Sequence, residues 1–244
     1  MSPYNRRMKR FRAFGAAAVA AGILFAPMVG QAGERAVVVE LFTSEGCSSC
    51  PPAHAVIGRI ARNPDILALS FHVDYWDYIG WKDSFAAPWA TRRQQVYASR
   101  LSSGRVYTPQ MVISGKVDVV GSRAPQVMRE LQRALETAPP TPLLRIVETE
   151  GESEILTNRH DTPAEIYLIR FDPVRETRVL RGENMGRHLL TFNVVRTYRK
   201  IVDWDGSAQR IPLPRDLDDH PGQIMAVIAQ RHGQGEVLGA AVVD

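Results

Sequence analysis

Cysteine is scarce in this chain, and several motifs of common enzyme classes are missing. Only two of its 244 residues are cysteine, which excludes a disulfide-rich scaffold. A hydrophobic content of 45% is enough to build a core without disulfides. The sequence contains no Ser-His-Asp signature, no glycine-rich phosphate loop and no dinucleotide-binding fingerprint. Nothing in it therefore indicates a serine hydrolase, a P-loop enzyme or a nicotinamide-dependent enzyme.

Excess positive charge is also lacking once the N-terminus is set aside. The formal net charge is +4, but five of the 30 basic residues and none of the 26 acidic residues lie in residues 1–32. The remainder has 25 basic and 26 acidic residues and no clustered basic face. We therefore expect no nucleic-acid partner.

The first 32 residues have the pattern of a secretory signal peptide. A basic stretch over 6–12 precedes an apolar stretch from Phe14 to Val29, and the cleavage positions follow at 30–32. The apolar stretch is short and rich in alanine and glycine, so a permanent transmembrane anchor is the weaker interpretation. We expect a periplasmic or secreted protein that contacts a membrane only if the signal remains uncleaved.

Two domains are predicted after the signal, because the remaining chain exceeds the usual size of one domain. Residues 33–138 follow the order of a two-layer α/β domain. Its expected elements are strands 36–42 and 66–73, helices 52–62 and 84–101, a hairpin over 110–114 and 117–120, and a helix over 124–135. Residues 139–142 form a proline-rich linker.

The chain beyond the linker, residues 143–244, predicts a small all-β domain resembling a sandwich. Strand-like alternation covers 143–149, 164–171, 187–201, 223–230 and 237–243. Residues 182–187 predict a hairpin turn, and a contact with the first domain or with a partner is the alternative for this turn.

The two cysteines form a Cys-x-x-Cys motif, Cys47-Ser48-Ser49-Cys50, between a predicted strand and a predicted helix. Free N–H groups and the dipole at a helix start favour the thiolate, which is the reactive form of cysteine. Cys47 is the candidate nucleophile, and Cys50 is the candidate resolving thiol that releases a mixed disulfide. Pro51-Pro52 shifts the expected helix start towards Pro51, and with it the effect of the dipole towards Cys50.

Two other interpretations of the motif remain open. A structural disulfide across so short a loop contributes only about 2 kcal/mol. A metal site, for copper for example, needs ligands beyond two thiolates, and His54 or His72 could complete a set, although no spacing demands it. The leading hypothesis is a thiol–disulfide oxidoreductase. It needs no cofactor and no resident metal, and its partners are protein thiols, protein disulfides or a redox partner protein.

These motifs resemble those of the thioredoxin-like superfamily. The likeness covers residues 36–137 and rests on the strand, the Cys-x-x-Cys helix, the second strand and Thr108-Pro109 before the hairpin and last helix. The chain resembles more closely a family of secreted thioredoxin-like proteins of unknown function, through residues 40–52 and 72–77. The resemblance implies a cis-proline at Pro109 that faces the cysteines, and a backbone at Thr108 that pairs with an extended substrate.

Other candidate site residues follow from their positions. Glu40 interrupts the first apolar strand, and the resemblance implies that a buried acid there moves the proton of the resolving cysteine. The alternative for Glu40 is an acid bonded to the backbone or turned toward solvent. His72, Asp74 and Trp76 follow the second strand, where open α/β sheets bind ligands, so they are candidate substrate-binding residues. Packing of the inserted segment is the alternative for them. His54 is expected on a solvated helix face.

Overall fold

The structure, a computed structural model, describes residues 33–35, 37–101, 104–139, 143–149, 152–214 and 221–243. The predicted signal over 1–32 and most of the predicted linker over 139–142 lie outside these residues. The first half contains β1 (Gly33–Arg35), β2 (Val37–Thr43), α1 (Pro51–Ile60), β3 (Ile66–His72), the 3₁₀ helix η1 (Asp77–Ile79), α2 (Pro88–Arg100), β4 (Gln110–Ile113), β5 (Val117–Val120) and α3 (Ala124–Thr137). The second half contains β6 (Leu144–Thr149), β7 (Glu152–Thr157), β8 (Ala164–Arg178), β9 (His188–Trp204), β10 (Gln209–Pro212), β11 (Ile224–Gln230) and β12 (Val237–Val243).

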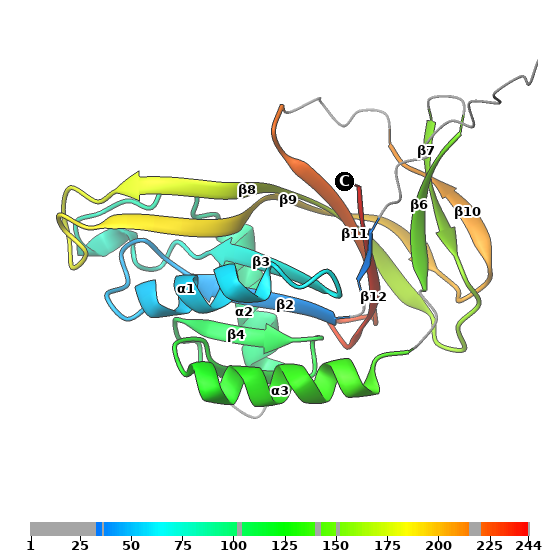
Figure 1. Cartoon of the computed structure of the whole chain (residues 1–244), viewed down its shortest axis with the longest axis horizontal. Coiled ribbons are helices and arrows are strands. Elements are labelled where there is room, and N and C mark those ends of the chain that lie inside the picture. The colour runs from blue at the N-terminus through cyan, green and yellow to red at the C-terminus, as the bar shows by residue number, and fades with distance from the viewer. Residues whose placement is uncertain are drawn as a thin grey trace, which may run out of the picture.

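One mixed sheet runs through both halves of the chain (Figure 1). It has nine strands in the order β1-β12-β11-β8-β9-β3-β2-β4-β5. A second sheet has three strands in the order β10-β7-β6. Among the described residues only α1, α2 and α3 are α-helices, so the protein is mostly β.

This architecture corrects the predicted fold class. We expected an α/β thioredoxin-like domain followed by a separate small β-sandwich, but β9 pairs in parallel with β3 at Ser70 and Val194 and joins the two halves. The Ser70 hydroxyl donates to the Phe192 carbonyl at 2.7 Å, and the Asn193 amide donates to the Ala68 carbonyl at 2.7 Å. A strand left at the edge of a sheet exposes unpaired backbone groups, and β9 removes that edge at β3.

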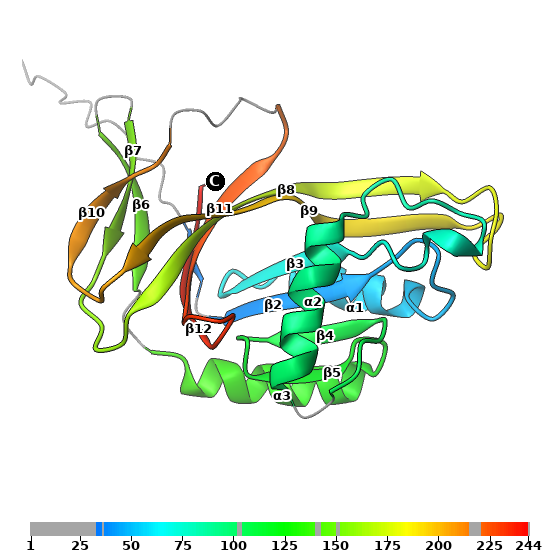
Figure 2. The same ribbon diagram turned by 180° about the vertical axis from the view of Figure 1, so that it is seen from behind.

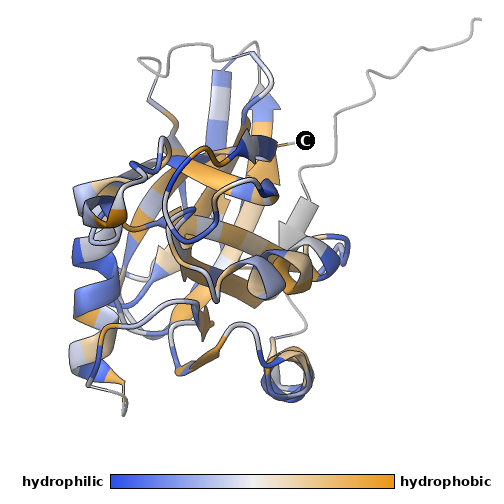
Figure 3. Cartoon of the chain, turned by 90° about the vertical axis from the view of Figure 1, so that its left-hand side faces the viewer, coloured by the Kyte–Doolittle hydropathy of each residue, from blue (hydrophilic) through white to orange (hydrophobic). Residues whose placement is uncertain are grey.

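The alternation of side chains along β2 divides the helices between the two faces of the sheet. Val37, Val39 and Leu41 pack with residues of α1 and α3, whereas Val38 and Phe42 pack with residues of α2. Figure 1 shows α1 in front of the sheet and α2 behind it, and Figure 2, seen from behind, shows α2 in front. All seven residues of β2 are buried because both faces are covered. Figure 3 shows the apolar segments gathered on the central strands and the polar ones on the outer helix surfaces.

The two longest strands, β8 and β9, extend beyond the rest of the sheet as a hairpin (Figure 1). Their connection, residues 179–187, is called the arm tip below. At the other end of these strands the three-stranded sheet packs against them, with Ile155, Ile166 and Trp204 in a shared apolar cluster. The arm tip therefore lies at the opposite end of these strands from the three-stranded sheet, on the side where α1 begins (Figure 1).

The contact between α1 and β9 depends on a glycine. A Cβ atom at Gly58 would lie 2.4 Å from Cε2 of Phe192, closer than packed atoms approach. In Gly58→Ala we expect overpacking to cost about 1–3 kcal/mol. Alanine returns about 1 kcal/mol through its higher helix propensity, so the free energy of unfolding should fall by up to about 2 kcal/mol. Urea unfolding measures the change, and a further Phe192→Leu substitution should recover part of it. A Gly58→Ala protein more stable than the wild type by the full gain in helix propensity would contradict this packing.

Candidate functional site

The Cys-x-x-Cys motif lies in the turn between β2 and α1. The Cys47 amide donates to the Ser44 carbonyl, and the Cys50 amide donates to the Cys47 carbonyl, both at 3.2 Å. Regular helix begins at Pro51, so Cys50 is the N-cap residue of α1. Cys47 and Cys50 are both free thiols, 1% and 0% exposed, while Ser48 and Ser49 between them are exposed.

The two thiols have opposite acidities. A hydrogen bond with Cys50 lowers the pKa of Cys47 to about 6 against the opposing effect of burial, and bonds with Ser49 and Thr108 act in the same direction. The Ser49 hydroxyl lies 3.3 Å from the Cys47 sulfur. Burial raises the pKa of Cys50 far above that of an ordinary thiol, and sharing a proton with the Cys47 thiolate raises it further. Near neutral pH Cys47 is therefore the thiolate and Cys50 the thiol.

Thr108 and Pro109 face the cysteine turn. The Thr108–Pro109 peptide bond is cis, as the resemblance implied. The Ser49 hydroxyl donates to the Thr108 carbonyl at 3.4 Å, and the Thr108 side chain bonds to Cys47. Trp76 belongs to the same group, because its indole N–H donates to the Thr108 hydroxyl at 2.7 Å. The structure thus brings together Cys47, Cys50, Thr108, Pro109 and Trp76.

The other two candidate substrate-binding residues have different neighbours. His72 is buried, and its Nδ1 lies 2.7 Å from an oxygen of Asp83. Asp74 accepts a bond of 2.5 Å from the Thr91 hydroxyl and so holds the first turns of α2 to the chain after β3. His72 therefore lies inside the protein, and the Asp74 carboxylate is hydrogen-bonded to α2.

Two buried acidic residues, Glu45 and Asp83, hold the backbone next to the cysteine turn. Asp83 accepts from the Glu45 amide at 2.8 Å, and Glu45 accepts from the Trp81 indole at 2.9 Å. Burial raises the pKa of Glu45, and the charge of Asp83 adds to this effect. Although burial opposes it, the neighbouring His72 holds the pKa of Asp83 below its usual value. These contacts fix the backbone that precedes Cys47.

Glu40 lies on the other face of the sheet from α1. Its two carboxylate oxygens accept bonds of 2.5 and 2.8 Å from Arg93, and one of them accepts a further bond of 2.6 Å from Tyr97. Because even-numbered residues of β2 face α2, Glu40 is the buried counter-ion of Arg93. The carboxylate is bonded to side chains of α2, so the alternative named above, an acid bonded to the backbone or turned toward solvent, does not describe its position.

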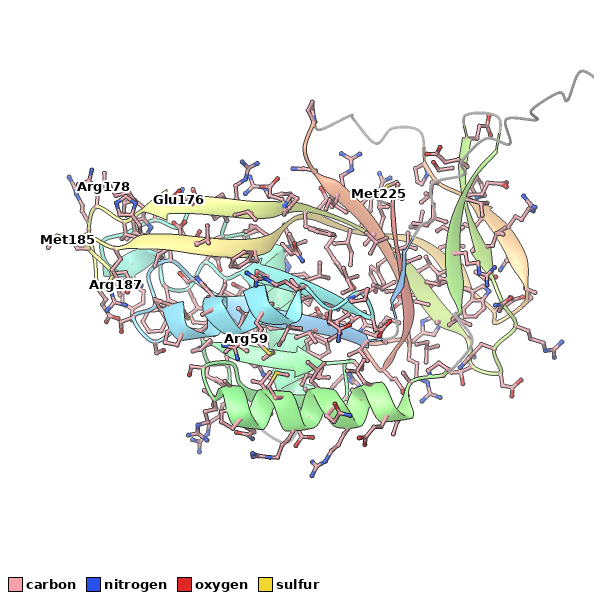
Figure 4. The ribbon with its side chains drawn as sticks, in the orientation of Figure 1. Arg59, Glu176, Arg178, Met185, Arg187 and Met225 are labelled. Atoms are coloured by element: carbon pink, nitrogen blue, oxygen red, sulfur yellow. The ribbon has the colours of Figure 1, made fainter. Side chains whose placement is uncertain are left out.

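The arm tip contacts the cysteine turn. The sequence did not identify the residues that make these contacts. The Asn184 amide donates to the carbonyls of Glu45 and Cys47 at 2.8 and 2.9 Å. The Ser48 amide donates to the Glu183 carboxylate at 3.3 Å. The turn over 182–187 thus contacts the first half of the chain. Figure 4 shows Met185 at the outer end of the arm.

His54 is buried, not solvated as we expected. It is 3% exposed because β3 and β9 cover the side of α1 that carries it, and its Nε2 lies 2.7 Å from the Thr43 hydroxyl. The Thr43 hydroxyl in turn bonds to the Cys50 sulfur. The alternation of β2 could have indicated this contact, because Thr43 lies on the face that α1 covers.

One group of metal-binding side chains occurs in the described part of the chain: Glu165, Asp203 and His232. The Lys200 ammonium already lies 3.3 Å from Glu165 and 2.9 Å from Asp203, so this group has a cation of its own. No group of three metal-binding side chains that includes a cysteine occurs in the same described residues.

Across the residues that the structure describes, no helix has the length and apolar character needed to span a bilayer.

Fold and site together define a mostly β protein with one mixed sheet and a Cys-x-x-Cys turn at the start of a helix. Residues 38–230 match the family described as "Protein of unknown function (DUF1223)", and the chain belongs to that family. No match was found among curated proteins.

Two solved structures are similar to this chain. A crystal structure of a protein from Agrobacterium tumefaciens, a structural genomics target, has 28% sequence identity and a TM-score of 0.74. The match covers 86% of this chain and 94% of that one. HBP35 of Porphyromonas gingivalis has 12% identity and a TM-score of 0.53, over 87% of this chain and 76% of that one. At this identity the second likeness concerns the fold alone.

Proposed function

We propose that this protein is an exported thiol–disulfide oxidoreductase that acts through Cys47 and Cys50. The observation that carries the proposal is the opposite acidity of two adjacent thiols, with the pKa of Cys47 lowered to about 6. A thiolate beside a protonated thiol provides the attacking group and the resolving group of disulfide exchange. The order β2-α1-β3, followed by Thr108-Pro109, β4, β5 and α3, also supports a relationship of this region to thioredoxin-like proteins.

The reaction transfers two electrons from the cysteine pair to a substrate disulfide. The Cys47 thiolate attacks one substrate sulfur, the substrate S–S bond breaks, and the first product leaves as a thiolate that takes a proton from solvent. Cys50 then loses its proton and attacks the Cys47 sulfur, which releases the second product thiol and leaves a Cys47–Cys50 disulfide. Run backwards, the same steps oxidise a pair of substrate thiols. Protein thiols, protein disulfides or a redox partner protein are the proposed partners.

A second function is favoured by the burial of the site. Cys47 is only 1% exposed, which suits a binding module that holds a partner and keeps inert cysteines. Insulin reduction by the chain without residues 1–32 separates the two functions. We expect turnover by the wild type and none by Cys47→Ser. Absence of turnover, together with no reactive Cys47 across a range of redox buffers, would leave the binding module.

The pH dependence of Cys47 alkylation provides a separate test. Because only the thiolate reacts, the rate of iodoacetamide labelling should fall below a midpoint near pH 6 and level off above it. Peptide mass spectrometry measures the rate at Cys47. In Cys50→Ser the largest pKa-lowering contact is weakened, so the midpoint should rise towards the ordinary thiol value of about 8.5. A wild-type midpoint already at that value would contradict the assigned nucleophile.

A further inference from the structure

The resolving thiol needs a proton acceptor, because Cys50 is 0% exposed and its pKa is far above that of an ordinary thiol. An acid on β2 was the expected acceptor. Glu40 does not serve, since both of its oxygens are bonded to α2 and it lies on the opposite face of the sheet from α1. The proton of Cys50 must leave through another group.

A hydrogen-bonded route leads from Cys50 into α1. The Thr43 hydroxyl interacts with the Cys50 sulfur, where it lowers the pKa of the thiol against the effect of burial. The same hydroxyl oxygen lies 2.7 Å from Nε2 of His54. A hydroxyl donates one proton and accepts others, so it can receive a proton from a thiol while giving its own to an imidazole. In that arrangement Nε2 of His54 is the acceptor and the ring carries its proton on Nδ1.

His54 offers a free proton acceptor and is not a satisfied structural histidine. Burial lowers the pKa of His54 to about 3, so the ring is neutral over the whole physiological range and Nε2 has a free lone pair. The same burial disfavours a proton that stays on the ring, so His54 passes the proton on and does not store it. Its Nδ1 is buried and has no hydrogen-bond partner among the residues that the structure describes, and the same is true of Nε2 of His72, whose ring centroid lies 6.3 Å from that of His54. Buried polar atoms without a partner are rare and call for an explanation.

The surroundings of His54 provide a way for a proton to leave. His54 lines a groove of about 510 Å³ between α1 and β9, and this groove is open to solvent. The charged or titratable groups that face or line the same space are His72 and Asp83 on the inner side and Arg59, Arg62 and His188 along the groove. The charge of Asp83 favours a proton on His54, and that of His72 opposes it.

We propose that His54, acting through the Thr43 hydroxyl, accepts the proton of Cys50 when Cys50 attacks the mixed disulfide. This inference rests on the oxidoreductase function proposed above. Cys50 gives its proton to Thr43, Thr43 gives its hydroxyl proton to Nε2 of His54, and the Cys50 sulfur bonds to the Cys47 sulfur. The bond from Cys47 to the substrate sulfur breaks with its electron pair on the substrate, which leaves as a thiolate. The proton on His54 passes to solvent through the groove, and in the reverse reaction it returns to Cys50.

The test separates resolution from attack. Cys47 of the reduced protein is reacted with 5,5′-dithiobis(2-nitrobenzoic acid). Release of the first aromatic thiolate reports attack by Cys47, and release of the second reports resolution by Cys50. In His54→Gln the first release should be unchanged and the second slower by roughly tenfold or more at pH 7. This is less than the roughly 10²–10⁴-fold of a base whose pKa matches the working pH, because burial disfavours a proton on His54. The matched control is His188→Gln, an exposed histidine of the same groove, in which both releases should match the wild type.

The pH profile gives a result that a merely structural role of His54 would not produce. With the relay, the second release is independent of pH between about 6 and 9, because His54 stays neutral there. Without it, Cys50 must lose its proton to solvent base, so the rate should rise about tenfold for each pH unit. Thr43→Val removes the hydroxyl but keeps the shape of the side chain, and it should give the same slope even if His54→Gln does not fold.

Three outcomes are distinguishable. A slow, pH-dependent second release in either variant supports the relay. A second release that is as fast and as independent of pH as in the wild type, in a folded variant, overturns it. If the wild-type protein itself releases no first thiolate, the oxidoreductase function has failed, and the relay falls with it.

Discussion

Replacing Arg93 by methionine is expected to lower the free energy of unfolding by about 3–5 kcal/mol, because it leaves the Glu40 carboxylate charged, buried and unpaired. The side chains of Arg93 and Glu40 are 2% and 1% exposed. Arg93 also donates to the Tyr198 hydroxyl of β9 at 2.6 Å and to Gln230 of β11 at 3.0 Å. One guanidinium on α2 thus bonds to strands from both halves of the chain. Urea unfolding, with an unchanged slope, measures the loss.

Two further variants test whether the unpaired Glu40 charge causes this loss. In Arg93→Met/Glu40→Gln the carboxylate is replaced by a neutral amide, so much of the lost stability should return. A neutral polar group costs less free energy to bury than an unpaired ion. The matched control is Arg133→Met on α3, where the arginine is 69% exposed and pairs with Glu130 at 2.8 Å. An exposed pair of this kind contributes about 0–1 kcal/mol. An Arg93→Met protein no less stable than Arg133→Met would contradict the role of the buried pair.

The local elements of the first half could be predicted from the sequence, because their signals are local. The apolar run at Val37–Thr43, the proline pair that starts α1 and the amphipathic spacing over Ala124–Thr137 each act within a few residues. The same holds for most strands of the second half. Two short strands, β7 and β10, escaped prediction because Glu152–Thr157 and Gln209–Pro212 are half-polar and brief.

The assembly of these elements could not be predicted in the same way. Alternation along β8 and β9 shows that one face is buried, but it does not say which strand edge they pair with. The joint at Ser70 and Val194 links residues more than a hundred positions apart, and its side-chain bonds depend on one serine and one asparagine. A proline-rich linker with a change of pattern after it therefore predicted two domains where one sheet continues.

The candidate site shows the same division. The cysteine pair and Thr108-Pro109 could be named because they form motifs, and the structure brings them together. His54 looked like a surface residue, because helical spacing alone cannot reveal that β9 covers the helix. Asn184 looked like an ordinary turn residue, because its partners are backbone carbonyls, which have no sequence signature.

Replacing Asn184 by alanine is expected to raise the alkylation rate of Cys47 by about fivefold or more. The Asn184 side chain is buried, and its amide holds the carbonyls of Glu45 and Cys47. A buried acceptor that loses its donor costs about 1–3 kcal/mol. Because about 1.4 kcal/mol corresponds to a factor of ten, the population in which the arm tip is detached from the cysteine turn should rise by about 5- to 150-fold. Labelling with iodoacetamide above pH 7, where Cys47 is the thiolate, measures the change.

The matched control lies one residue further along the arm tip. The Met185 side chain is 70% exposed, and its backbone amide donates to the Gly182 carbonyl within the arm tip, so Met185→Ala should leave the labelling rate unchanged. Equal rates in Asn184→Ala, Met185→Ala and the wild type would mean that the arm tip does not limit access to Cys47. A selective increase in Asn184→Ala would reconcile a buried sulfur with a redox function. A substrate would then reach Cys47 by displacing Asn184, and the affinity of the arm tip for the turn would be one determinant of which partners react.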